Sequence, residues 1–175
     1  DDDGRFTDDV DSFAGRSAFN IDMHGNLWEQ VAKFRAGRRL WAKIVKERFG
    51  ATNPRSMLLR MIAGGGGGGL TVQQPENNIV RGAYYALISA LSGTQTMALC
   101  SYDEAYTIPS KKAALISLRT MQILADELES KHIPVNAVNP GPVRTRFRTM
   151  AYPGEDARQL TKPEEVTDAF VYLLS

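Results

Sequence analysis

Six consecutive glycines at positions 64–69 follow an apolar run and are the first candidate for a binding loop. A Walker-type phosphate loop needs Lys and then Ser or Thr after its last glycine, whereas Leu70 and Thr71 follow here. The dinucleotide fingerprint needs spaced glycines, a condition that an unbroken run meets trivially. We interpret the run as a loop at the carboxyl end of a strand, where its backbone approaches a ligand closely. The alternative is slack backbone, which is costly to order.

Acid–base chemistry has few candidates. A short-chain reductase needs a Tyr four residues before a Lys, but Tyr106 lies five residues before Lys111, and the residue four after Tyr102 is Tyr106. His24 fits a general acid or ligand, or a turn residue. Cys100 fits a small buried apolar residue better than a reactive thiol. We therefore assign no catalytic residue and no metal ligand.

The composition excludes several classes. The chain has 175 residues, 21 Lys and Arg, 20 Asp and Glu, and one Cys. A net charge of +1 gives no reason to expect a nucleic-acid partner, and one Cys excludes a disulfide framework. No apolar run approaches the ~20 residues of a membrane span. We expect a cytoplasmic protein that contacts no membrane.

Strands and helices alternate along the sequence. Apolar runs predict strands over 17–22, 56–63, 94–100 and 134–138, and three-to-four spacing predicts helices over 27–49, 75–92, 111–128 and after 161. Their expected ends are caps or stops at Asn26, Gly50, Gly93, Ser110 and a Thr161–Glu164 capping box. This order predicts an α/β fold whose parallel strands alternate with helices. The basic face of the first helix fits a solvated surface better than a site for CoA phosphates.

Three segments in one order carry a family resemblance. They are VAKFRAGRRLWAKIVKERFGATNPRSMLLR (31–60), LTVQQPENNIVR (70–81) and GTQTMALCSYDEAYTIPS (93–110). Over about residues 15–127 the chain resembles the large subunit of the coenzyme-B12-dependent acyl-CoA mutases, the methylmalonyl-CoA mutase family. The resemblance implies the last part of the TIM-type barrel that holds an acyl-CoA, and an isomerase that uses adenosylcobalamin.

The resemblance also implies roles for single residues. Arg16 and Gln95 match positions that contact the CoA ester, and Glu104 matches a residue that reaches the adenosyl ribose. Gly64 and Gly65 are expected beside the CoA ester as well. The alternatives are a surface ion pair for Arg16, backbone pairing for Gln95 and a solvated loop charge for Glu104.

The chain departs from the family pattern near the acyl group. The family's His and Gln after the second strand become Ile62 and Gly64, its His-Thr-Asn becomes residues 98–100 (Ala-Leu-Cys), and a Ser near Arg16 becomes Ala18. A free carboxylate on the substrate would lose hydrogen-bond partners there. The departures therefore favour a wider, less polar acyl pocket than methylmalonyl-CoA needs.

The end of the chain carries a second resemblance. LADELESKHIPVNAVNPGPVRTRF (124–147) and residues 151–175 resemble the later part of a short-chain dehydrogenase/reductase. That resemblance implies a Rossmann-like βα fragment in which Pro140, Gly141 and Thr145 lie beside the nicotinamide of NAD(P). The two resemblances overlap in the helix predicted over 111–128.

We therefore predict a partial TIM-barrel-like segment over residues 1–128, followed by a Rossmann-like fragment over 129–175. The expected function is that of an adenosylcobalamin-dependent acyl-CoA mutase fragment. Because no Asp-x-His-x-x-Gly cobalt motif occurs in the chain, a separate cobalamin-binding small subunit is expected as partner. The alternatives are an NAD(P)-dependent short-chain dehydrogenase/reductase and a non-catalytic fusion of two fragments.

Overall fold

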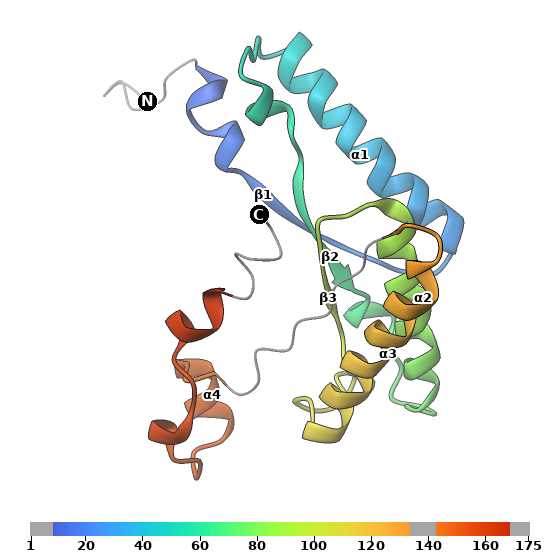
Figure 1. The fold of residues 1–175 in the computed structure, drawn as a ribbon, viewed down its shortest axis with the longest axis vertical. Coiled ribbons are helices and arrows are strands. Elements are labelled where there is room, and N and C mark those ends of the chain that lie inside the picture. Colours follow the sequence, from blue (N-terminus) through green and yellow to red (C-terminus); the bar gives the residue numbers. More distant parts are fainter. Residues whose placement is uncertain (1–8, 134–142, 169–175) are drawn as a thin grey trace.

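A three-stranded parallel sheet forms the centre of the molecule (Figure 1). The computed structural model describes residues 9–133 and 143–168. Strands β1 (Ala18–Asp22), β2 (Arg60–Gly65) and β3 (Thr96–Leu99) lie side by side in chain order. All three therefore point the same way, and their carboxyl ends meet at one edge of the sheet.

Three long helices follow the strands. Asn26 begins the first helix, its Oδ1 accepting from the Glu29 N–H (3.2 Å), and Ser110 begins the third in the same way, accepting from the Ala113 N–H (3.1 Å). Gly93 ends the second helix with φ +65°, as glycine at this position permits. These caps confirm the sequence prediction for the helices, which are α1 (Leu27–Glu47), α2 (Asn77–Ser92) and α3 (Lys111–Glu129).

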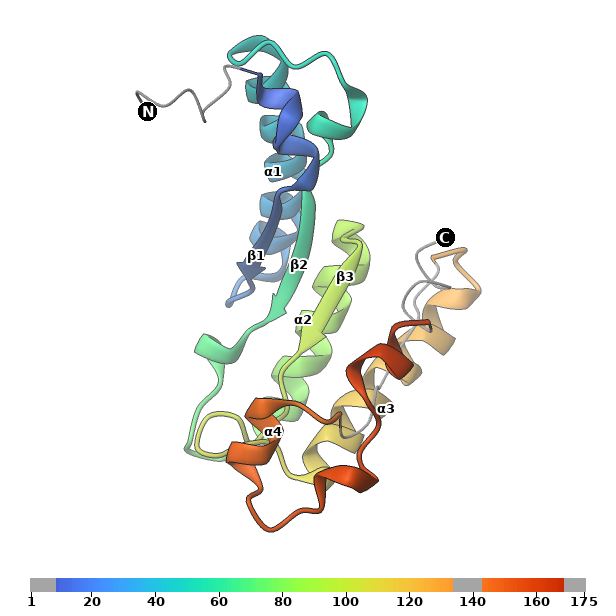
Figure 2. The ribbon, with the colours of Figure 1, turned by 90° about the vertical axis from the view of Figure 1, so that its left-hand side faces the viewer.

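Helices α1 and α2 cover one face of the sheet, as Figure 2 shows from the side of the strands. The buried core lies between these layers and is apolar apart from one phenol: Met23, Phe34, Leu59, Met61, Ala63, Tyr85 and Ile88. Helix α3 packs on α2. Burying such side chains contributes about 1.5–3 kcal/mol each, which stabilises the single-sided arrangement.

No helix among the described residues packs closely on the other face of the sheet. Side chains alternate along each strand, so the residues between the core positions point to this face. The register places Ile62 between Asn20 and Thr96, and Gly64 between Asp22 and Ala98. Ile62 is 44% exposed. This face is thus a mixture of small, apolar and polar side chains.

Strand β2 differs from its predicted range. The predicted strand begins at residue 56, but Pro54–Met57 form a 3-10 helix and β2 starts only at Arg60. Pro54 fixes its own φ in the helical range and sits at the helix start, where its missing N–H is not needed. At the other end β2 runs on into Gly64 and Gly65, so the glycine run is partly strand.

The C-terminal part is a series of short elements. These are helix α4 (Arg146–Ala151) and the 3-10 helices Ala157–Gln159 and Pro163–Val166. An isolated parallel bridge pairs Val143, which precedes α4, with Thr161, which lies between the two 3-10 helices. The predicted strand 134–138 lies outside the described residues. No helix in the ranges 9–133 and 143–168 is long and apolar enough to cross a membrane.

The predicted capping box at Thr161 and Glu164 is wrong by one residue. Glu165 accepts from the Lys162 N–H (3.1 Å), and the following turn begins at Pro163. Thr161 is instead engaged in the bridge, where its carbonyl accepts from the Arg144 N–H (2.8 Å). Thr161 is held in the bridge to Val143, so it does not cap the turn. The turn starts later, at Pro163, because proline suits the first helical position.

Candidate functional site

The carboxyl edge of the sheet brings together several polar residues from different strands and loops. Asp22 ends β1, the glycine run leaves β2, and Cys100 follows β3, with Glu104 in the next loop. In α/β proteins this edge is where ligands bind, because loops from successive strands converge there. We therefore take the glycine loop, Asp22, His24, Cys100 and Glu104 as the candidate site.

The glycine loop is fitted closely to its neighbours. A Cβ on Gly65 would come within 2.0 Å of the Ala98 carbonyl oxygen, and one on Gly66 within 2.2 Å of the Tyr85 ring. A Cβ on Gly69 would lie 2.4 Å from the Tyr85 hydroxyl. Gly66 also has φ +78°, which only glycine adopts readily. The close approach expected of the run is therefore made to the protein's own strand β3 and to Tyr85.

Asp22 fastens the loop to β1. Its Oδ1 accepts from the Gly66 N–H (3.1 Å), and its Oδ2 lies 3.4 Å from Nε2 of His24. From α1, Lys33 donates to the Asp22 carbonyl (2.7 Å). Burial lowers the pKa of Lys33, and the charge of Asp22 partly offsets that effect. Nothing in the sequence alone singled out Asp22, because Gly66, the partner of its carboxylate, is 44 residues away along the chain.

Asn78 joins three segments beneath the site. Its Oδ1 accepts from the N–H of Thr71 (3.1 Å) and from Arg81 (2.9 Å), while its Nδ2 donates to the carbonyls of Thr71 and Tyr102 (both 2.9 Å). The side chain is 1% exposed. All of its hydrogen-bonding capacity is thus used to hold the glycine loop and the loop after β3 to helix α2. Asn78 lies in the motif LTVQQPENNIVR, but no pattern in the sequence indicated this role.

Cys100 and Glu104 lie together after β3. Burial and the adjacent Glu104 carboxylate raise the pKa of the Cys100 thiol from 9.0 to about 12, so it is protonated at neutral pH. Glu104 itself is exposed, and the Ser101 N–H fixes one of its oxygens at 2.7 Å. An exposed carboxylate held in this way fits the role expected at the hydroxyls of a ribose.

Arg16 and Gln95 lie at the opposite edge of the sheet. Arg16 precedes β1 and donates to the Ser12 carbonyl, and Gln95 precedes β3 and donates to the Leu59 carbonyl (3.4 Å). Both side chains are exposed. The structure thus separates Arg16 and Gln95 from Gly64, Gly65 and Glu104 by the length of the strands.

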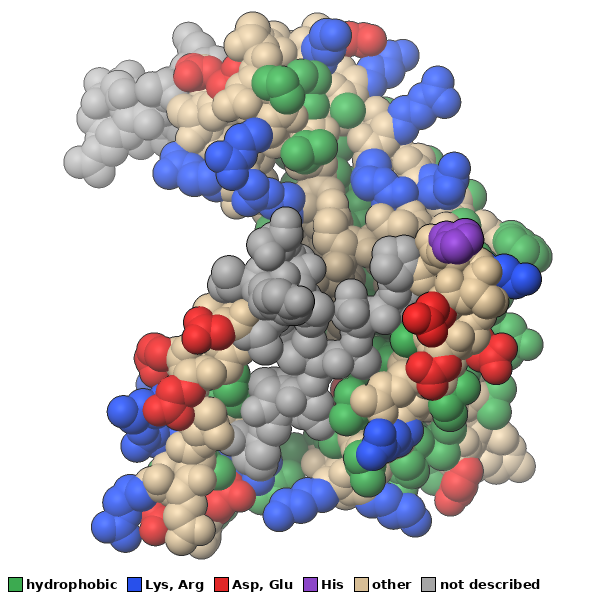
Figure 3. All heavy atoms as spheres, in the orientation of Figure 1, with side chains coloured by type: hydrophobic (Ala, Val, Ile, Leu, Met, Phe, Trp, Pro, Cys, Tyr) green, Lys and Arg blue, Asp and Glu red, His purple; other side chains and the backbone are tan. Residues whose placement is uncertain are grey.

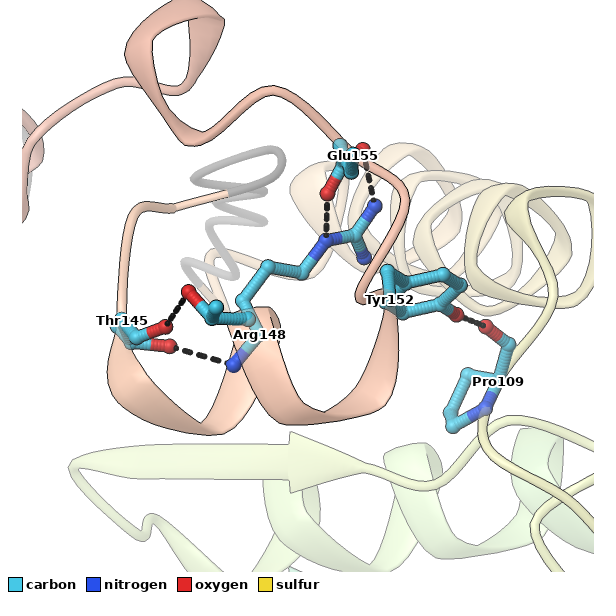
Figure 4. Close-up of polar contacts among 6 residues, drawn as sticks. Pro109, Thr145, Arg148, Tyr152 and Glu155 are labelled. Carbon is cyan, nitrogen blue, oxygen red and sulfur yellow. Dashed lines mark hydrogen bonds and ion pairs between the residues drawn. The ribbon is translucent and has the colours of Figure 1, made fainter.

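The residues predicted to meet a nicotinamide are placed only in part. Pro140 and Gly141 lie outside the described residues. Thr145 is the N-cap of α4, where its hydroxyl accepts from the Arg148 N–H (3.1 Å; Figure 4). Arg148 forms a bidentate ion pair with Glu155, from Nε to Oε2 (2.6 Å) and from Nη2 to Oε1 (2.8 Å), and its guanidinium lies over the Tyr152 ring. Because Tyr152 donates to the Pro109 carbonyl (3.3 Å), this cluster attaches the C-terminal part to the loop before α3.

The basic residues of α1 gather on the outer surface (Figure 3). Arg35, Arg39, Lys43, Lys46 and Arg48 are exposed. Lys33 and Arg38 are partly buried and donate to the carbonyls of Asp22 and Ser92. This face is therefore mainly solvated, as the sequence predicted.

Comparison with known proteins identifies the family. Residues 7–136 match the methylmalonyl-CoA mutase family, which is more than half of the chain. The chain therefore belongs to the methylmalonyl-CoA mutase family. This confirms the resemblance to that family, whereas the resemblance of about residues 121–175 to short-chain dehydrogenases/reductases stays a prediction.

Named relatives align with 118 residues, 67% of the chain. Identity is 48% to the 2-hydroxyisobutanoyl-CoA mutase large subunit of Aquincola tertiaricarbonis, covering 21% of that protein. It is 41% to the mitochondrial methylmalonyl-CoA mutase of Homo sapiens and 40% to methylmalonyl-CoA mutase of Cereibacter sphaeroides, covering 16% of each. The chain thus spans about a fifth or less of the length of these relatives.

Proposed function

We propose that residues 7–136 form the last part of the acyl-CoA-binding barrel of an adenosylcobalamin-dependent acyl-CoA mutase, an isomerase. The match of this range to the mutase family carries the proposal. The arrangement of strands and helices supports the proposal. The parallel strands lie in chain order and their connecting helices cover one face, as in a segment of a barrel. A doubly wound sheet has helices on both faces.

We assign a role to each predicted site residue from its position in the sheet. Arg16 and Gln95, at the amino edge of the sheet, would contact CoA, and Gly64 and Gly65 would lie beside the ester. Glu104, at the carboxyl edge, would accept hydrogen bonds from the adenosyl ribose. When bound, adenosylcobalamin supplies the radical chemistry, and the protein's task is to position the substrate and exclude water.

A separate cobalamin-binding small subunit completes the proposal. One relative is named a large subunit, which supports a division between two polypeptides. Because no Asp-x-His-x-x-Gly motif occurs in these 175 residues, the proposal assigns cobalt ligation to that subunit.

Binding measurements on the 175-residue chain test this function. Calorimetric titration with isobutanoyl-CoA should give a binding isotherm, and Arg16→Ala or Gln95→Ala should weaken it by about tenfold or more if these residues contact CoA. Arg39→Ala, on the solvated face of α1, is the control. The proposal would be contradicted if neither isobutanoyl-CoA nor any other acyl-CoA tested gave a binding isotherm. It would also be contradicted if the chain enhanced the fluorescence of NADPH instead.

A further inference from the structure

Three arginines from separate segments meet at the amino edge of the sheet. Arg16 and Arg55 lie in the 3-10 helices that precede β1 and β2, and Arg60 is the first residue of β2. The two 3-10 helices are in contact, since a Cβ on Gly15 would lie 3.7 Å from the Cβ of Arg55. The strand register pairs Arg60 with Ala18, two residues after Arg16. Lys and Arg side chains gather over the short helix before β1 and the start of that strand (Figure 3).

The described residues do not neutralise this positive charge. All three arginine side chains are exposed, and among the described residues none of them forms an ion pair. Arg16 donates to the Ser12 carbonyl, which is uncharged. The two described acids that precede it, Asp9 and Asp11, already accept from backbone N–H groups. Because like charges on adjacent segments repel, the arrangement favours an anion that contacts more than one guanidinium.

Apolar side chains are exposed next to the arginines along the chain. Phe13, three residues before Arg16, is 53% exposed, and Leu58, between Arg55 and Arg60, is 59% exposed. An aromatic ring on the ligand would cover such apolar groups. The guanidinium suits phosphate in particular, because its planar group donates two parallel hydrogen bonds to phosphate oxygens. A nucleoside diphosphate combines the ring with several negative charges.

We propose that Arg16, Arg55 and Arg60 form a binding site for a nucleoside diphosphate group. Two ligands carry this group, a free nucleotide and the nucleotide part of an acyl-CoA. The assignment to acyl-CoA rests on the proposed function, whereas the site itself rests on the three arginines. A rise of about 3.3 Å per residue puts Gly64 about 13 Å along β2 from Arg60. The acyl end of a CoA bound here would extend along the strands toward the glycine loop.

Titration with ADP tests the site in the absence of an acyl group. Calorimetry on the 175-residue chain should show ADP binding, and Arg55→Gln or Arg60→Gln should each weaken it about tenfold or more. Both side chains are exposed, so the two variants should melt like the wild type. Arg39→Gln, on the solvated face of α1, is the matched control. Absence of ADP binding, or equal weakening by Arg39→Gln, would overturn the inference.

Two thioesters distinguish this inference from the proposed function. Isobutanoyl-CoA and S-isobutanoyl-pantetheine share the acyl group and the thioester, but only the first carries the nucleotide. The wild type should bind isobutanoyl-CoA about tenfold or more tighter, and Arg60→Gln should reduce this preference severalfold. A preference unchanged in both Arg55→Gln and Arg60→Gln would overturn the assignment of the site to acyl-CoA. Arginine-dependent binding of ADP without binding of either thioester would overturn the proposed function and support the site.

Discussion

The aromatic ring of Tyr85 lies directly on the backbone of Gly66. A Cβ at residue 66 would stand 2.2 Å from Cε2 of Tyr85, and Tyr85 is 5% exposed within the core between the sheet and α2. The glycine run is therefore part of the packed structure at this point. Its lack of side chains lets the loop turn over the ring at the carboxyl edge of the sheet.

Gly66→Ala should therefore destabilise the fold strongly. The alanine would have to adopt φ +78° and would collide with the Tyr85 ring, so the free energy of unfolding should fall by about 2–4 kcal/mol. Gly67→Ala in the same loop is the control, because its Cβ would meet only the Cys100 sulfur at 3.4 Å. Urea denaturation of the two variants measures the difference, and equal stabilities would show that the loop is slack.

Removing Asn78 should have a comparable effect. Asn78→Ala would leave the partly buried carbonyls of Thr71 and Tyr102 and the Thr71 N–H without their partner, at a cost of about 2–3 kcal/mol. Asn77→Ala is the matched control, since Asn77 is the exposed neighbour and bonds only to Gln74. Thermal unfolding should give a clearly lower melting temperature for Asn78→Ala than for Asn77→Ala. A similar loss in both would mean that helix propensity dominates at this position.

Acid should weaken the N-terminal part through Asp11. The backbone N–H of Thr52, with further hydrogen bonds from Asn53 and the Thr52 hydroxyl, lowers the pKa of Asp11 from 3.8 to about 2. A carboxyl whose pKa is lower in the folded state stabilises above its unfolded pKa and loses that contribution as pH falls through the folded value. The stabilisation should therefore be full above about pH 4 and disappear toward about pH 2.

Asp11→Asn tests this titration by melting temperature against pH. The variant should be less stable than the wild type near neutral pH, and the two curves should converge between about pH 4 and pH 2. Glu47→Gln, whose partner Lys43 is 4.0 Å away in an exposed pair, should run parallel to the wild type. Curves for Asp11→Asn that stay parallel throughout would refute the lowered pKa.

Much of this architecture was predictable from local signals, and much of the site was not. Asn26, Gly93 and Ser110 act within one turn of their helices, so type and spacing were enough to predict them. Asp22 meets Gly66 only after β1 and β2 pair in register. Such a long-range contact leaves no local pattern in the sequence.

Strand direction explains why the predicted site residues divide into two groups. Arg16 and Gln95 precede their strands, whereas Gly65 and Glu104 end or follow theirs. In a parallel sheet these positions lie at opposite edges. Matching single positions to a family does not reveal this separation. A ligand that contacts both groups has to extend along the sheet, which suits the length of an acyl-CoA.

The thiol of Cys100 should be unusually unreactive. Its pKa is raised to about 12, so the thiolate fraction near neutral pH should be at least about a hundredfold below that of a free cysteine. Alkylation by iodoacetamide should be slow for the same reason, because the thiolate is the reacting form. Glu104→Gln removes the neighbouring charge, so the pKa should fall and the rate rise severalfold. Glu76→Gln, an exposed acid at the start of α2, is the control. Since Cys100 is the only cysteine of the chain, the modified mass reports this one site. Rapid alkylation of the folded wild type would contradict the partly buried position of the sulfur next to the Glu104 carboxylate.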